Sequence, residues 1–156
     1  MWKIDVPGFR KLKINYLVFD FNGTLAVDGK LVKGVSERLN KLSQHLNIHI
    51  LTADTYSTVR SEFSDSKIEI HIIAPNNQDR EKVEYIKSLG CDRVVCFGNG
   101  ANDKLMLKES ALGIGVLLEE GIYINSLISS DIVVKDIIDG LDLLLHPLRL
   151  VATLRK

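Results

Sequence analysis

Four polar side chains have types and positions that could do chemistry, because each lies at the end of an apolar segment or beside one. Asp20 and Thr52 end two apolar runs, Lys82 lies in the first turn of a predicted helix, and Asp103 closes the glycine-rich stretch 98–103. Two carboxylates can hold Mg²⁺, whose octahedral shell favours hard oxygen ligands. A hydroxyl can donate to a phosphoryl oxygen, and an ammonium group can offset the charge that develops in phosphoryl transfer. Together these side chains predict phosphoryl transfer with Mg²⁺.

Each of these residues also has an ordinary structural interpretation. An Asp at a strand end, such as Asp20, commonly accepts hydrogen bonds from turn amides. Asp103 could cap a helix, and Gly98 and Gly100 could serve only the turn. A lysine in the first helical turn, like Lys82, is commonly a solvated surface residue. The functional interpretation therefore requires that these side chains meet at one edge of a sheet.

The elements that must position them follow from the hydrophobic pattern. Apolar runs rich in β-branched residues predict strands at 16–20, 48–51, 68–74, 93–97, 112–117 and 131–134. Helical periodicity predicts helices at about 36–45, 79–89, 105–111, 119–129, 137–145 and 148–156. Strands and helices alternate along the chain, which predicts a doubly wound sheet with right-handed crossovers.

Turn signals add two hairpins. Alternating residues around Pro7-Gly8 predict an N-terminal hairpin, and Asp28-Gly29 predicts a very short second hairpin over 26–32 that could act as a flap. We therefore expect a three-layer α/β/α Rossmann-like sandwich with a mainly parallel sheet and no separate cap domain. The 156 residues suit one domain: the hairpin at 1–15, the α/β core at 16–146 and a C-terminal amphipathic helix at 147–156.

Open α/β sheets bind ligands where the winding reverses, beyond the carboxyl ends of the strands. If the reversal places strand 16–20 beside strand 93–97, Asp20 and the loop 98–103 share one crevice. Gly98 and Gly100 would then let backbone amides approach an anion, with the start of the following helix aimed at the same place. This crevice predicts phosphate binding.

A dinucleotide site is the competing interpretation of the same loop. Gly98-Asn99-Gly100 follows a strand and precedes a helix, as in a dinucleotide fingerprint. Asp103, however, stands where the third glycine belongs, and its charge would repel a pyrophosphate unless a metal intervened.

Composition excludes some classes of partner. Twenty Lys and Arg balance twenty Asp and Glu, so no global field favours nucleic acid or an anionic membrane. No run approaches the ~18 apolar residues of a membrane span. Cys91 and Cys96 have no CxxC partner and resemble reduced core residues. We expect a soluble, cytoplasmic protein.

The motifs together resemble those of a known family. Asp20-Phe21-Asn22-Gly23-Thr24-Leu25, Thr52, Lys82 and Gly98-Asn99-Gly100-Ala101-Asn102-Asp103 are similar to the four ordered motifs of the haloacid dehalogenase (HAD) superfamily of phosphohydrolases. The segment 102–134 resembles the phosphorylation domain of P-type ion-pumping ATPases. The resemblance points to stand-alone soluble proteins of that kind as the nearest relatives.

The resemblance implies roles for individual residues. Asp20 would be the nucleophile that forms an aspartyl-phosphate, with Thr52 and Lys82 binding the phosphoryl group. The metal site would comprise Asp20, the backbone carbonyl of Asn22, Asp103 and Asn99, with Mg²⁺ as the ion. The remaining phosphate-binding positions would be Gly23, Gly98, Gly100 and Asn102.

Two departures from the family pattern affect these expectations. Asn22 stands where most of these phosphatases carry the general acid/base Asp, and an amide cannot shuttle a proton, so slow turnover or a trapped phosphoenzyme is expected. Asn99 replaces a carboxylate near the metal, which should weaken Mg²⁺ binding. The alternatives are a catalytically impaired phosphate- or nucleotide-binding regulatory module that needs a partner, and nucleotide binding without transfer.

The spacing of the motifs predicts an open pocket. About thirty residues separate Asp20 from Thr52, and a similar number separate Thr52 from Lys82, which leaves no room for a cap domain. The phosphorylated substrate could therefore be a small molecule or a macromolecule, and a second copy or a partner domain could cover the site and supply the missing acid. Specificity cannot be deduced from the sequence.

Overall fold

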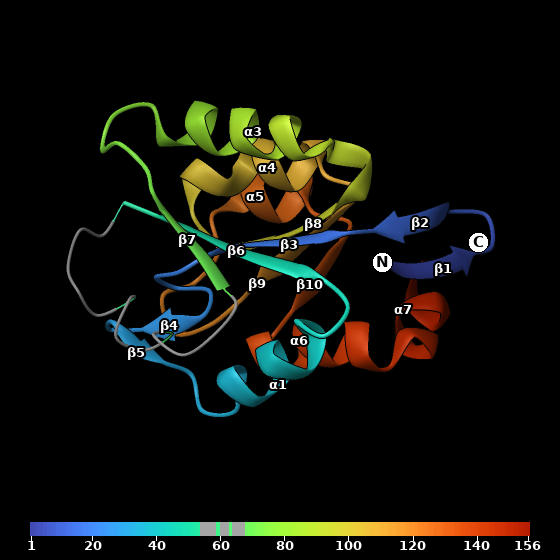
Figure 1. Ribbon diagram of the computed structural model, residues 1–156. Coiled ribbons are helices and arrows are strands. Elements are labelled where there is room, and N and C mark those ends of the chain that lie inside the picture. Colours follow the sequence, from blue (N-terminus) through green and yellow to red (C-terminus); the bar gives the residue numbers. More distant parts are fainter. Residues whose placement is uncertain (54–58, 60–62, 64–67) are drawn as a thin grey trace.

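A six-stranded sheet forms the centre of the computed structural model, which describes residues 1–53, 59, 63 and 68–156. Its strands, in chain order, are β3 (Tyr16–Asp20), β6 (Asn47–Thr52), β7 (Ile68–Ile72), β8 (Val94–Gly98), β9 (Leu112–Val116) and β10 (Ile132–Val134). They lie in the order β10-β9-β8-β3-β6-β7, and all neighbours are parallel. The winding reverses between β3 and β8, which lie side by side as expected (Figure 1).

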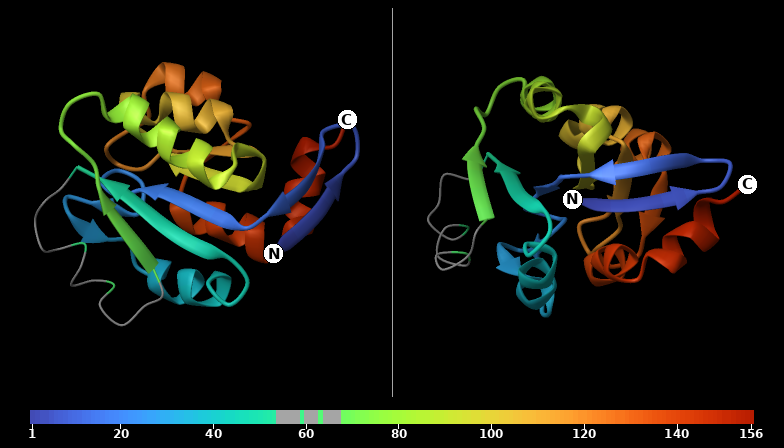
Figure 2. Two further views of the ribbon diagram at one scale, coloured as in Figure 1. Left: turned by 45° about the horizontal axis from the view of Figure 1, so that its top comes forward. Right: turned by 45° about the vertical axis from the view of Figure 1, so that its right-hand side comes forward.

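Helices cover both faces of the sheet (Figures 1 and 2). One face carries α3 (Gln78–Leu89), α4 (Lys104–Glu109) and α5 (Ile124–Ser129). The other carries α1 (Val35–Leu42) and α6 (Ile137–Leu145), which leads on to α7 (Pro147–Leu154). Two short 3-10 helices, η1 (Cys91–Arg93) and η2 (Ala101–Asp103), flank β8. The three-layer sandwich predicted from the alternation of strands and helices is confirmed.

The apolar run of β3 forms a strand because both of its faces are buried. Leu17, Val18 and Phe19 have no exposed surface. Successive side chains point to opposite faces, so Val18 joins the core beneath α3, and Phe19 stacks on the Phe97 ring in the other core with 4.6 Å between ring centroids. The strand thus places its last residue, Asp20, at the edge of a rigid, fully packed element.

Both predicted hairpins are present. The first, β1 (Trp2–Val6) with β2 (Arg10–Ile14), is antiparallel and projects beyond the central sheet beside α7 (Figure 2). The second joins β4 (Ala26–Val27) to β5 (Lys30–Leu31). Its two turn residues, Asp28 and Gly29, have φ angles of 49° and 73°, the left-handed backbone that an Asp-Gly turn supplies readily.

Several element boundaries differ from the sequence predictions. The helix expected at 119–129 begins only at Ile124, because Gly121, with a φ of 76°, forms a turn before it. The helix expected at 36–45 ends at Leu42, and the strand expected at 68–74 ends at Ile72. The sequence also predicts that Asp54 or Thr55 caps a helix after strand 48–51, but both residues lie outside the described residues. In the described part of the chain, no helix has the length and apolar character needed to cross a membrane.

Candidate active site

The candidate site begins at Asp20, the last residue of β3. The pairing of β3 with β8 places this carboxylate beside the loop that follows β8, as the predicted reversal of winding requires. Only 9% of Asp20 is exposed. A carboxylate this deeply buried needs charged or hydrogen-bonding partners.

Lys82 supplies the main partner. Its ammonium Nζ lies 2.7 Å from Oδ1 of Asp20 and 2.6 Å from Oδ1 of Asp103. Lys82 and Asp103 have no exposed surface, so the interpretation of Lys82 as a solvated surface residue is wrong. The lysine reaches this position because α3 packs over the sheet face that ends in Asp20. Three segments distant in the sequence therefore meet in one buried charge cluster.

The charges in this cluster shift the protonation of its members. Burial, reinforced by the nearby Asp103 carboxylate, outweighs the attraction of Lys82 and raises the pKa of Asp20 to about 7. Burial alone would lower the pKa of Lys82, but Asp20 and Asp103 more than compensate and raise it. The lysine therefore stays charged, and a further cation beside Asp20 would favour its ionised, nucleophilic form.

Asp103 organises the loop that follows β8. Its Oδ2 accepts hydrogen bonds from the backbone N–H of Asn99 (2.9 Å) and of Gly100 (2.8 Å). Asp103 makes no side-chain capping bond at the start of α4; its carboxylate instead accepts from the N-cap backbone of η2 and also contacts Lys82. Gly98 is required by space, since a Cβ there would lie 2.5 Å from Cγ of Asp103.

These contacts bear on two predicted roles. The amide of Gly100, expected to approach a phosphate, donates to Asp103 in this structure, and its role in phosphate binding stays a prediction. Asp103 was expected to be a direct metal ligand, yet it is fully buried and both of its oxygens are engaged. Its geometry suits the positioning of Lys82 and of the loop.

Asn99 and Asp20 converge on Thr24, a residue whose role the sequence reasoning missed. The hydroxyl of Thr24 lies 3.4 Å from Oδ2 of Asp20 and 3.3 Å from Oδ1 of Asn99. One hydroxyl has one proton, so it can satisfy only one of these oxygens at a time. Asn99 is oriented by donating from Nδ2 to the carbonyl of Gly121 at 3.0 Å. Two side-chain oxygens thus lie on either side of one hydroxyl, and oxygens of this kind are the ligands that Mg²⁺ prefers.

Gly23 makes room for this arrangement. Its φ of 80° lies in the left-handed region, and a Cβ there would collide with the side chain of Asn99. Thr24 follows Gly23 within the same motif, four residues after Asp20. The four-residue separation of Thr24 from Asp20 across a tight turn is the sequence feature that could have identified Thr24 as a site residue.

The other predicted site residues lie around this centre. Thr52 is buried at the end of β6, directly beside β3. Asn22 has an exposed side chain two residues beyond Asp20. Asn102 was expected to bind phosphate, but it donates to Oε1 of Gln78 at 2.6 Å and so joins the loop to α3.

An open pocket lies beside the Asn102–Gln78 contact. Its volume is about 620 Å³, and it is lined by Pro75, Asn77, Gln78, Asp79, Ala101 and Asn102. The lining is mainly polar and comes from the same two segments that carry Lys82 and Asp103.

The comparisons with known sequences give two relatives. No family model matches the chain. An uncharacterised protein of Methanocaldococcus jannaschii is 54% identical over 63 residues, which are 40% of this chain and 68% of that protein. A second uncharacterised protein of the same organism is 51% identical over 39 residues, or 25% of this chain and 89% of that protein. Neither relative has an assigned activity.

Similar solved structures are more informative about the fold. A HAD superfamily (subfamily III A) hydrolase of Legionella pneumophila has a TM-score of 0.71 at 16% identity, with 90% of this chain and 87% of that chain covered. The 3-deoxy-D-manno-octulosonate 8-phosphate phosphatase of Moraxella catarrhalis, in complex with magnesium and phosphate ions and its sugar acid, has a TM-score of 0.68 at 20% identity, with 91% and 94% covered. The cobalt-bound form of a deoxy-D-mannose-octulosonate 8-phosphate phosphatase from Haemophilus influenzae has a TM-score of 0.66 at 14% identity, with 86% of this chain and 88% of that chain covered. The similarity spans nearly the whole chain.

Proposed function

We propose that this chain, which has the fold of the HAD superfamily of hydrolases, is a metal-dependent phosphohydrolase that uses Asp20 as its nucleophile. The observation that carries this proposal is the meeting of Asp20, Lys82 and Asp103 at the carboxyl edge of the sheet. Burying a lysine between two carboxylates costs desolvation free energy that their mutual attraction often fails to offset, so stability alone is a weak reason for this arrangement. Perturbed ionisable groups gathered at such an edge are typical of catalytic sites.

Asp20 has one oxygen for orientation and one for attack. Oδ1 is held by Lys82, which leaves Oδ2 beside Thr24 and Asn99. We infer that a carboxylate oxygen of Asp20 attacks phosphorus while the bond from phosphorus to the ester oxygen breaks, giving an aspartyl-phosphate. Water then attacks this phosphoryl group, which releases phosphate and regenerates the carboxylate. Lys82 and the Thr52 hydroxyl would offset the charge on the phosphoryl oxygens.

The residues present fit a divalent cation. We assign its protein ligands to Asp20, the Asn99 side-chain oxygen and the backbone carbonyl of Asn22, with Asp103 as a positioning residue. Bound there, the cation would supply positive charge that favours ionised Asp20 and neutralises the phosphoryl oxygens. Because Asn99 is neutral, we expect weaker Mg²⁺ binding than a second carboxylate ligand would give.

The pocket beside Asn102 favours a small phosphorylated substrate. Its amide groups and the carboxylate of Asp79 offer both donors and acceptors to a hydroxylated molecule. The Moraxella phosphatase described above is in complex with phosphate and a sugar acid. We therefore propose a phosphate monoester of a small polar metabolite as the substrate class.

The resemblance of the end of the chain to P-type ATPases stays a prediction. Our proposal needs only the cluster around Asp20. It makes no use of a transport partner.

The proposal is tested by measuring phosphate release from p-nitrophenyl phosphate and from a panel of sugar phosphates. We expect activity in the wild type that needs Mg²⁺ and is abolished in Asp20→Asn. Asp92→Asn, which changes an exposed carboxylate far from the cluster, is the matched control and should retain activity. Equal activity in Asp20→Asn, with both variants folded by circular dichroism, would refute Asp20 as nucleophile. No activity in the wild type with any substrate would point to the regulatory binding module instead.

A further inference from the structure

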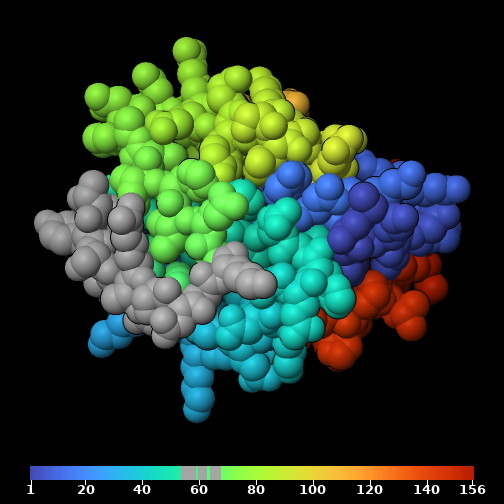
Figure 3. Space-filling view, viewed as in Figure 1, coloured from blue at the N-terminus to red at the C-terminus, as the bar shows by residue number. Residues whose placement is uncertain are grey.

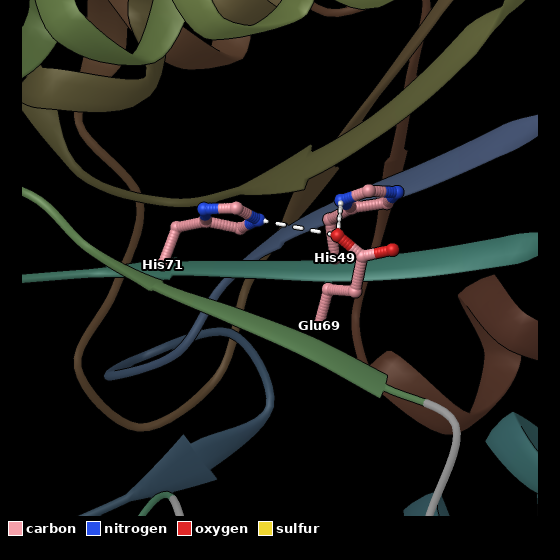
Figure 4. Close-up of side chains that lie close together, drawn as sticks. All are labelled: His49, Glu69 and His71. Atoms are coloured by element: carbon pink, nitrogen blue, oxygen red, sulfur yellow. Dashed lines mark ion pairs between the residues drawn. The ribbon is translucent and has the colours of Figure 1, made fainter.

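We propose that this protein has a second metal site, formed by His49, Glu69 and His71, which binds a divalent transition metal such as Zn²⁺. His49 lies on β6, and Glu69 and His71 lie on β7. The three side chains point toward one another from these neighbouring strands (Figure 4). Nothing in the phosphohydrolase proposal depends on them.

The strand register explains why these residues meet. His49 pairs with Glu69, and His71 is two residues further along the same strand. Since side chains alternate along a strand, Glu69 and His71 share one face of the sheet. It is the face that α3 covers, because Tyr85 of that helix contacts both histidines. The cluster therefore occupies the outer two strands, whereas the catalytic carboxylates come from β3 and the loop after β8.

The distances suit a small tetrahedral ion. Oε2 of Glu69 lies 3.6 Å from Nδ1 of His49 and 3.5 Å from Nε2 of His71. All three ligand atoms lie within 4.8 Å of one another. Zinc bonds of about 2.0–2.1 Å place the ligands of a tetrahedron roughly 3.4 Å apart. Two of the three separations thus already have the required length.

Burial favours the form of the His49 imidazole that can bind a metal. His49 is only 3% exposed, and burial lowers its pKa, so its imidazole is neutral, the form that binds metals. The nitrogen Nδ1 faces Glu69 and Tyr85, while Nε2 has no hydrogen-bond partner among the described residues. A leucine at position 49 would pack among the neighbouring apolar side chains without leaving a buried nitrogen unpaired. The nitrogen that faces Glu69 is Nδ1, so Nδ1 and not the unpartnered Nε2 is the ligand atom that we assign to His49.

When no ion is bound, hydrogen bonds with Tyr85 hold the two histidines together. Its hydroxyl lies 2.8 Å from Nδ1 of His49 and also hydrogen-bonds with Nε2 of His71. Burial, together with the Glu69 charge, raises the pKa of Tyr85 to about 12, so the hydroxyl stays neutral. A metal would take over both nitrogens, with water completing its shell. The same atoms therefore have two states, hydrogen-bonded and metal-bound.

An ion can enter from solvent. The side chains of Glu69 and His71 are 64% and 38% exposed. Strand β7 forms an edge of the sheet, and its residues lie at the molecular surface in Figure 3. Two imidazoles and one carboxylate select Zn²⁺, Ni²⁺, Cu²⁺ or Co²⁺ over Mg²⁺, which prefers oxygen ligands. A bound metal would crosslink the edge strand β7 to β6.

Titration of the full chain with Co²⁺ in the presence of excess Mg²⁺ tests this site. Tetrahedral Co²⁺ with nitrogen ligands gives strong visible absorption, whereas an octahedral oxygen site absorbs weakly. We expect one equivalent of strongly absorbing Co²⁺, displaced by Zn²⁺, in the wild type and in Asp20→Asn. In His71→Ala the affinity should fall by at least ~100-fold, more than the 10–100-fold typical of losing an outer-shell partner.

The controls separate this site from the catalytic crevice. His45→Ala removes an exposed histidine outside the cluster and should bind Co²⁺ like the wild type. Glu69→Gln keeps the size of the side chain and should weaken binding without unfolding the protein. No strongly absorbing Co²⁺ in the wild type, unchanged binding in His71→Ala, or loss of binding in Asp20→Asn would each overturn the proposal.

Discussion

At the scale of single residues, the proposed nucleophile, Asp20, is followed two residues later by an amide, Asn22, where an acid would be expected. Asn22 is exposed. An amide has no titratable proton at neutral pH, so the leaving oxygen must take its proton from water or from a partner. We therefore expect the amide at position 22, more than the fold, to limit the rate of the proposed hydrolysis.

Restoring an acid at this position should accelerate turnover. We predict that Asn22→Asp raises kcat toward p-nitrophenyl phosphate by up to roughly 10²–10⁴-fold, the usual contribution of general acid/base catalysis. Asn40→Asp, at an exposed position on α1, should leave the rate unchanged. If Asn22→Asp has no effect, proton transfer does not limit this enzyme.

Lys82 has a second, energetic role that can be measured without any substrate. Its charge lies between two buried carboxylates, and removing it leaves two like charges with no counter-ion. We predict that Lys82→Met lowers the free energy of unfolding by about 3–5 kcal/mol at pH 8. Urea denaturation followed by circular dichroism measures this loss.

The effect of Lys82→Met should also depend on pH. Burial already raises the pKa of folded Asp20 to about 7, and removing Lys82 takes away the charge that lowers it, so the stability of the variant is lost as pH rises through the folded pKa of Asp20. The variant should therefore be closer to the wild type at pH 5 than at pH 8. Lys87→Ala, which removes an exposed lysine from the same helix, should show neither change. A loss that is independent of pH would mean that packing, and not charge, explains the defect.

At the scale of elements, α1 and α6 are joined by one ion pair over the sheet face opposite α3. Arg38 donates from Nε and from a terminal nitrogen to the two carboxylate oxygens of Asp142, at 2.7 and 3.1 Å. The side chains are 24% and 20% exposed. Such a two-bond geometry fixes the relative position of two helices that local sequence cannot relate.

This ion pair predicts a pH dependence of stability. The hydrogen bond from Arg38 lowers the pKa of Asp142 below its ordinary value of 3.8. Because the folded pKa is depressed, the stabilisation is complete above the unfolded value and is lost as pH falls through the lower folded value. A double-mutant cycle with Arg38→Gln and Asp142→Asn should give a coupling of about 0.5 kcal/mol at pH 7. The coupling should decrease as pH falls below 3.8 toward the lower folded pKa of Asp142, and a coupling that does not change with pH would contradict the assignment.

At the scale of the whole molecule, the two ends of the chain pack against each other beyond the central sheet. Trp2 donates from Nε1 to the carbonyl of Leu144 at 3.2 Å, and the amide of Lys156 donates to the carbonyl of Pro7 at 3.0 Å. Leu150 of α7 has no exposed surface. These contacts predict that the N-terminal hairpin and α7 unfold together with the core, as parts of a single domain.

Two leucines on the same helix test this prediction. Leu150→Ala should lower the free energy of unfolding by about 2–5 kcal/mol, because it creates a cavity in the core. Leu148, which is 81% exposed, is the matched control, and Leu148→Ala should change stability by no more than about 0.5 kcal/mol. One cooperative urea transition is expected for both variants. A separate early transition in Leu150→Ala would show that the tail is an independent unit.

The sequence by itself determined much of this fold. Local hydrophobic periods predict the strands and helices, since a buried element must repeat its apolar side chains at its own period. The charged end of strand 16–20 and the glycine-rich loop 98–103 fixed the two sides of the candidate site. Boundaries were less certain, as at Ile124, because turn geometry there competes with helical periodicity.

Only the tertiary structure decided which of these residues touch. Lys82 could be assigned to a helix from sequence, but its burial between two carboxylates depends on how α3 crosses the sheet. The engagement of Asp103 with two loop amides likewise emerges only in three dimensions. His49 and His71 come together through the register of two strands that the sequence does not specify. Side-chain periodicity is local information, whereas contacts between distant segments depend on the packing of the whole chain.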